Sequence, residues 1–144
     1  SYIGDLSDAE LLKRPGKGCN HIAWQLGHLI SSECGLLNAI QPEAAPKLPE
    51  DFDHKHSKEN SVSDNPTDFF TRQQYVDLAA KVHAAVIRCL DAYPAEKLDD
   101  PSPEHFRGMF PTIGSMFLLI ATHPMMHAGQ FVPVRRELDK PVVI

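Results

Sequence analysis

The last quarter of the chain carries the feature that most limits its fold, an apolar pattern with the period of a helix. From Met116 to Leu138, the positions of one mostly apolar face recur at steps of three and four residues. That spacing predicts a helix with one face turned toward a core. Two histidines stand on this face, at positions where leucine or isoleucine is usual. The face consists of Met116, Ile120, His123, His127, Gln130, Val134 and Leu138.

His123 and His127 lie four residues apart, so a helix brings both rings to one side, about one turn apart. A buried imidazole needs a hydrogen-bond partner or a metal, because an unsatisfied buried polar group costs roughly 1–3 kcal/mol. From this pair alone two interpretations stay open: core histidines with protein partners, or a metal site that needs a third ligand. The pattern is not that of zinc proteases, in which Glu follows the first His, because Pro124 stands there.

Composition narrows the class of protein. A chain of 144 residues predicts a single domain, over residues 1–144, with one substantial core. The formal net charge is −5 and no basic run occurs, so we expect no nucleic-acid partner. The longest apolar run, at 116–121, is too short to span a bilayer, so we expect no membrane partner. Three cysteines without a Cys-x-x-Cys pair fit a reducing compartment, and we expect a cytoplasmic protein.

Caps, apolar stripes and prolines predict helices and no strands. Asn20 is the expected N-cap of one long helix. Thr71 and Gln74 form a capping box before the next, and Thr112 is the expected cap of the last. The helices are expected over residues 8–13, 21–40, 72–92 and 113–138.

These helices predict an all-α four-helix bundle. Tyr2 and the apolar residues after it look like the tail of a preceding helix, so we expect the first helix of the bundle to be missing or truncated. Residues 41–70 are rich in proline and charge, and they predict a long crossover connection between the second and third helices. Pro124 and Pro133 should kink the last helix or make it restart, and we favour a kink.

The helix predicted over 21–40 contains two polar residues of interest. Glu33 falls in the middle of the apolar stripe, so its carboxylate needs a partner. His28 lies on the flank of the stripe beside Trp24, a position that can still face the interior of a bundle. His54 and His56, in the long connection, are expected to lie in a solvated loop.

Two motifs carry a resemblance to a known family. One is Gly-His-Leu at 27–29, and the other is His-x-x-x-His at 123–127 followed by Gly-Gln at 129–130. In this order, with a long connection and a middle helix between them, they resemble the DinB/YfiT-like superfamily over nearly the whole chain. Members of that family bind one divalent metal with three such histidines at the end of a four-helix bundle. Pro124 departs from the family pattern, and this departure affects the expected local geometry of the helix, not the number of ligands. The ligands that the resemblance implies are His28, His123 and His127.

The resemblance also implies a cofactor, one divalent metal ion. Three neutral imidazoles suit zinc, nickel or iron, and they leave coordination positions open, as catalytic sites do. Three further residues are candidates near the metal. Gln130 is expected to hydrogen-bond a ligand or a water, and Glu33 to orient His28. Trp24 is expected to line the pocket wall. For these three residues, ordinary packing or capping remains the alternative.

The resemblance suggests a metal-dependent enzyme that acts on a small-molecule substrate. Members of the superfamily include thiol-dependent S-transferases, which use bacillithiol, mycothiol or glutathione, and a maleylpyruvate isomerase. A metal there would stabilise the thiolate of a low-molecular-weight thiol, and hydrolysis is the other enzymatic option. Two alternatives stay open: a non-catalytic metal-binding or stress-response protein, and a structural helical bundle that acts through protein contacts. The family also implies a homodimer.

Overall fold

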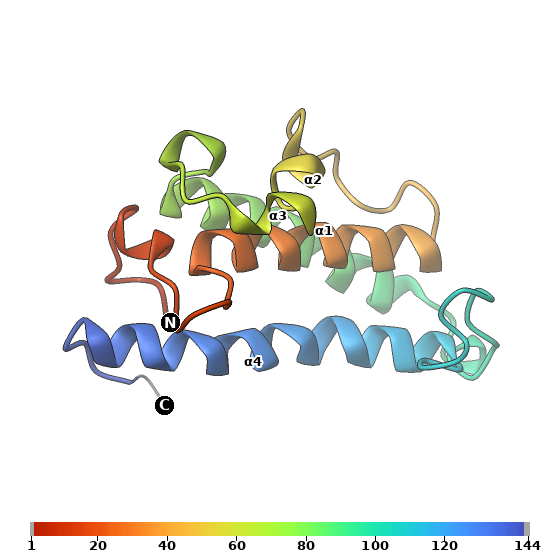
Figure 1. The fold of residues 1–144 in the computed structure, drawn as a ribbon. Helices are drawn as coiled ribbons and strands as arrows, with labels where there is room; N and C mark the ends of the chain where they lie inside the picture. Colours follow the sequence, from red (N-terminus) through yellow and green to blue (C-terminus); the bar gives the residue numbers. More distant parts are fainter. Residues whose placement is uncertain (1, 143–144) are drawn as a thin grey trace.

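The structure, a computed structural model, describes residues 2–142, so residues 1 and 143–144 of the predicted domain lie outside it. Within residues 2–142 the chain is helical and forms no strand, which confirms the predicted all-α bundle (Figure 1). None of the described helices is both long and apolar enough to cross a membrane. The helices are α1 (Ile22–Ile40), α2 (Phe52–Lys55), α3 (Arg72–Ala92) and α4 (Ile113–Glu137).

The chain before α1 forms turns and one single-turn 3-10 helix, Glu10–Leu12, in place of the α-helix predicted over 8–13. Ser7 and Glu10 exchange capping bonds, from backbone N–H of Ser7 to the Glu10 carboxylate at 2.6 Å and from N–H of Glu10 to the Ser7 hydroxyl at 3.2 Å. These bonds start a turn, but Pro15 follows closely and disfavours helical angles in the residue before it. The turn therefore ends after three residues.

The start of α1 differs from the prediction by one residue. Its N-cap is His21, whose Nδ1 accepts a hydrogen bond from the N–H of Trp24 at 3.0 Å. A bare imidazole nitrogen can do this because it accepts a hydrogen bond as a hydroxyl oxygen does. The backbone carbonyl of Asn20, the predicted cap, instead accepts a hydrogen bond from the side-chain amide of Gln25 at 2.7 Å.

The packing of α1 against both α3 and α4 sets the order of the bundle (Figure 1). One hydrophobic cluster contains Ile22 and Tyr75, from the N-terminal ends of α1 and α3. A second cluster contains Leu37 and Val86, which lie toward their C-terminal ends. The two helices therefore run parallel, and residues 41–71 cross the length of the bundle between them. This confirms the predicted crossover connection.

Helix α4 runs antiparallel to α1, with Val134 in the first cluster and Met116 in the second. It remains a single helix through Pro124 and Pro133, so it does not restart at either residue. Both prolines are exposed. Each proline removes one N–H donor from the helix, but its ring lies on the solvent side and displaces no core side chain.

The crossover connection packs more closely than predicted. His54 is exposed as expected, but His56 is only 4% exposed, so its predicted place in a solvated loop is wrong. The His56 ring lies with Nδ1 2.8 Å from the carbonyl oxygen of Phe52 and Nε2 2.7 Å from the hydroxyl of Tyr75. Gly27 makes room for it, because a Cβ there would come within 2.0 Å of the ring. Tyr75 and Gly27 lie far from His56 in the sequence, so no local pattern reveals these two contacts.

Candidate metal centre

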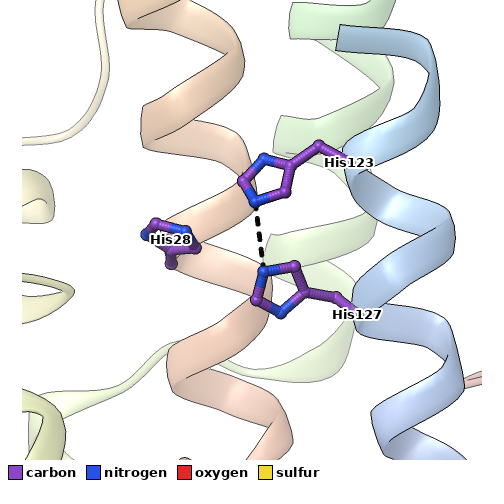
Figure 2. Close-up of side chains that lie close together, drawn as sticks. All are labelled: His28, His123 and His127. Carbon is purple, nitrogen blue, oxygen red and sulfur yellow. Dashed lines mark hydrogen bonds between the residues drawn. The ribbon is translucent and has the colours of Figure 1, made fainter. Parts of the chain in front are cut away.

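Three histidines from two antiparallel helices converge between the two hydrophobic clusters. His28 projects from α1, and His123 and His127 project from successive turns of α4 (Figure 2). One nitrogen atom from each ring lies within 4.8 Å of the other two. On α4 the buried apolar residues stop at Ile120 and resume at Phe131, so the histidines fill a gap in the core. The flank of α1 that carries His28 therefore faces α4.

The spacing of the donor atoms fits one metal ion. Two nitrogens bound to the same zinc ion, each at about 2.0–2.1 Å in tetrahedral geometry, lie about 3.4 Å apart. Nε2 of His123 and Nε2 of His127 are 3.2 Å apart. His28 offers the third nitrogen from the opposite helix, with ring centroids 5.3 Å from both other rings. Three imidazole nitrogens suit zinc, nickel and iron alike.

Gln25 holds the most buried ligand in the tautomer that a metal needs. Nδ1 of His127 lies 2.8 Å from Oε1 of Gln25, and the Gln25 side chain is fully buried. The amide of Gln25 is oriented by its own bond from Nε2 to the carbonyl of Asn20. An amide oxygen only accepts, so Nδ1 of His127 carries the proton and Nε2 keeps a free lone pair. Sequence reasoning missed this role, although an amide three residues before His28 on the same helix is a signal for it.

Trp24 restrains the ring of His28. The two rings are stacked, with centroids 5.1 Å apart and planes 4° from parallel. The indole N–H donates a hydrogen bond to the carbonyl of Ser57 at 2.9 Å, which ties the tryptophan to the crossover connection. Trp24 therefore lies directly behind the ring of His28.

Burial keeps all three imidazoles neutral near pH 7. It lowers the pKa of His28, His123 and His127 below the ordinary value of 6.5, and that of His127 to about 4. The neighbouring imidazoles contribute to this lowering for His28 and His127, because a second positive charge nearby is unfavourable. Neutral imidazoles are the form that binds metals.

The family model described as DinB superfamily matches residues 1–131. The chain belongs to the DinB superfamily. The matched range includes all three histidines of the cluster. No curated protein and no solved structure matches this chain.

Two residues predicted near the metal of this DinB-superfamily protein, Glu33 and Gln130, make no hydrogen bond to the three histidines in the described part of the chain, although Glu33 and His123 line the same small pocket. Glu33 lies 3.4 Å from Nδ1 of His83 on α3 and not against His28. Five residues at about 100° each place Glu33 about 140° around α1 from His28, on another side of the helix. Gln130 is exposed on α4. The contact to a ligand that was expected of Gln130 is made by Gln25, from the facing helix.

A cleft of about 650 Å³ opens beside the histidines of this DinB-superfamily protein. His28 and His123 line it, whereas His127 lies behind them and is 6% exposed. Its walls come from α1, from α4 and from the segment 105–110 that precedes α4. A metal held by the three rings would therefore be reachable from the cleft, as a catalytic site requires.

A larger hollow, of about 950 Å³, lies between α1 and the start of the crossover connection, away from the histidines. Cys34 and Asp53 line it. Burial, together with the nearby charges of Glu33 and Asp53, raises the pKa of the Cys34 thiol to about 11. A thiol in that state is a poor nucleophile, so this hollow offers no activated group for catalysis.

Proposed function

We propose that this protein is a metal-dependent enzyme whose reactive centre is the cluster of His28, His123 and His127. The observation that carries the proposal is the combination of three converging imidazole nitrogens with a cleft that reaches two of them. A closed structural site would need a fourth protein ligand. Among the described residues, the group that could hold a metal contains these three histidines alone.

Neighbouring side chains hold two of the three histidines in position at this centre. His127 is held by Gln25 with its Nε2 lone pair toward the site, and His28 is held by stacking on Trp24. A divalent metal bound there supplies a Lewis acid that can favour a thiolate or polarise a substrate oxygen. The apolar walls of the cleft exclude water from one side of the site, which strengthens electrostatic interactions within it.

The reaction class we favour is transfer to a low-molecular-weight thiol, with hydrolysis as the other option. Hydrolysis needs a side chain that accepts a proton from water, and among the residues that line the cleft there is no carboxylate. His105, at the rim, is the one titratable group there besides the histidines of the cluster. A thiol is acidic enough to need less assistance from a base. The expected homodimer remains a prediction.

Elemental analysis of the untagged protein tests the centre first. We expect about one zinc, nickel or iron ion per chain, and its loss in each of the variants His28→Ala, His123→Ala and His127→Ala. His54→Ala is the matched control, because that histidine is exposed and lies outside the cluster. Wild-type protein that takes up no metal from salts of all three would overturn the proposal.

Activity is then tested by offering the metal-loaded protein thiols together with electrophilic small molecules. We expect thiol-dependent turnover that disappears with the metal and in the His28→Ala variant. Turnover that needs no thiol and consumes water would move the assignment to hydrolysis.

A further inference from the structure

The walls of the cleft beside His28 and His123 are apolar. Its lining comes from three separate parts of the chain, so it exists only in the folded protein. Both phenylalanines belong to the segment 105–110, and the two methionines are exposed. The apolar side chains that line it are Leu36, Phe106, Met109, Phe110, Leu119 and Met126.

The lining also lacks permanent charge. None of the residues that line this cleft is Lys, Arg, Asp or Glu. Its polar side chains are Ser32, Thr122 and the histidines His28, His105 and His123. A carboxylate or phosphate placed against these walls, away from the proposed metal, would lose water without gaining a cation, which is unfavourable. The formal net charge of −5 further opposes an anion.

We infer that the cleft holds a neutral substrate with an apolar, ring-sized body, and that its reactive group points to His28 and His123. The inference rests on the proposed function, because it names the substrate class of that centre. It assigns the cleft to the electrophilic small molecule that reacts with the thiol. A charged thiol would approach from the open rim with its carboxylates in water.

The cleft can be probed with ligands that share one metal-binding group. Imidazole, 4-phenylimidazole and 4-(imidazol-4-yl)benzoate all offer the same nitrogen to a zinc ion. They differ in whether they carry an apolar ring or a ring with a carboxylate. Calorimetry on the zinc-loaded protein measures the three affinities. Trp24, the single tryptophan, stacks on His28 and gives an independent fluorescence signal.

In the wild type we expect 4-phenylimidazole to bind about ten- to a hundredfold more tightly than imidazole, from burial of its ring. We expect the benzoate to lose most of that gain. Equal affinities for imidazole and 4-phenylimidazole, or a benzoate that binds as tightly as 4-phenylimidazole, would overturn the inference.

Two neighbouring methionines give a matched pair of variants. Met126 lines the cleft, whereas Met125 does not and is 73% exposed. We expect Met126→Glu to remove most of the phenyl gain while zinc content is kept, and Met125→Glu to change neither. Met126→Lys should reduce the difference in affinity between the benzoate and 4-phenylimidazole. Equal losses of the phenyl gain in the Met125 and Met126 variants would contradict the inference.

The proposed function and this inference fail in different ways. If none of zinc, nickel and iron binds, or if imidazole gives no signal with the metal-loaded protein, the metal-dependent enzyme is wrong. If zinc and imidazole bind but the phenyl ring adds nothing, the centre stands and the substrate class is wrong.

Discussion

Two groups of buried or partly buried histidines lie in this molecule, and they differ in what their ring nitrogens contact. In the first group, Nδ1 of His21 accepts a bond from the N–H of Trp24, and its Nε2 lies 3.1 Å from the carbonyl of Ser63. His56 is bonded at one nitrogen to a carbonyl of α2 and at the other to the hydroxyl of Tyr75. Every nitrogen of this group has a protein partner, so neither ring is available to a metal.

The second group is the metal-centre cluster, and its nitrogens face one another. His127 has one nitrogen bonded to Gln25 and the other 3.2 Å from Nε2 of His123. Among the described residues, His28 has no side-chain hydrogen bond and is held by stacking. Burial of a histidine is therefore no sign of a metal site by itself. The sign is a set of neighbouring imidazoles that each turn one nitrogen toward the others.

The sharpest test of this difference removes one histidine from each group. We expect His28→Ala to lower metal affinity at least about a thousandfold, more than the 10–100-fold that loss of a ligand's hydrogen-bond partner usually costs. Its stability without metal should change little, because His28 is only partly buried. Competition with a chelator of known affinity measures the first quantity, and urea unfolding the second. Stoichiometric metal in His28→Ala would mean that two imidazoles suffice.

The opposite pattern is expected for His56. We expect His56→Ala to lower the free energy of unfolding by about 2–4 kcal/mol, from the cavity and from the lost partner of Tyr75. Metal affinity should stay within threefold of the wild type, which is about the limit of such a measurement. A large loss of metal affinity in a variant that remains folded would contradict the separation of the two groups.

Gly27 allows the same contact to be tested from the other side. Gly27→Ala places a methyl group on the His56 ring, so we expect a loss of about 1–3 kcal/mol. In the background of His56→Ala the added methyl group has space, and the loss should shrink or change sign. A double-mutant cycle by urea unfolding measures this coupling. Additive losses would show that the close approach of Gly27 and His56 is absent in solution.

The pH dependence of stability should reflect both groups when metal is absent. Burial holds the pKa of His56 and of His127 at about 4, below the ordinary 6.5 that they regain on unfolding. The unfolded chain therefore binds protons first. The stabilising contribution is present above pH 6.5 and is lost as the pH falls toward 4, by up to about 3 kcal/mol for each residue.

Urea unfolding between pH 7 and pH 4.5, with a chelator present, measures this loss. His56→Leu and His127→Leu should each flatten part of the profile. A profile that is unchanged in both variants would show that neither ring is held neutral by the fold.

Gln25→Met tests the tautomer of His127 with a side chain of similar size. Without the amide oxygen, His127 is free to place its proton on Nε2, so we expect metal affinity to fall about 10–100-fold. Glu33→Gln is the matched control on the same helix, because Glu33 hydrogen-bonds to His83 and not to one of the three histidines. Equal effects of the two substitutions on metal affinity would remove the assigned role of Gln25.

The smallest effect is expected from removal of the metal itself. Hydrophobic clusters lie on both sides of the histidines and hold the helices together without it. We expect a chelator to lower the melting temperature by only a few degrees and to leave the helical circular dichroism unchanged. Complete unfolding on chelation would show that the metal is a structural requirement.

Local patterns were enough to predict most of the helices. The capping box of Thr71 and Gln74 predicted α3 with its observed bounds, and Thr112 was correctly predicted as the cap of α4. Capping bonds join residues about three positions apart, so they can be read from sequence. The cap of α1 was wrong, because His21 has an acceptor nitrogen and takes the place of Asn20.

Contacts between distant residues decided the rest. The bond between Gln25 and His127 joins positions 102 residues apart, and no local spacing predicts it. Glu33 was expected beside His28, but its partner His83 belongs to another helix. Long-range contacts of this kind form only when α1 is placed between α3 and α4.

The sequence by itself determined the helices and, through a family motif, which three histidines belong together. The tertiary structure alone decided which buried histidines keep free nitrogens, because a lone pair is free only if no donor from elsewhere in the chain reaches it. It also decided the shape of the cleft, since three segments that are distant in sequence must pack side by side to form its walls. Helix formation is a local property of the chain, whereas the chemistry of this centre depends on what surrounds each ring.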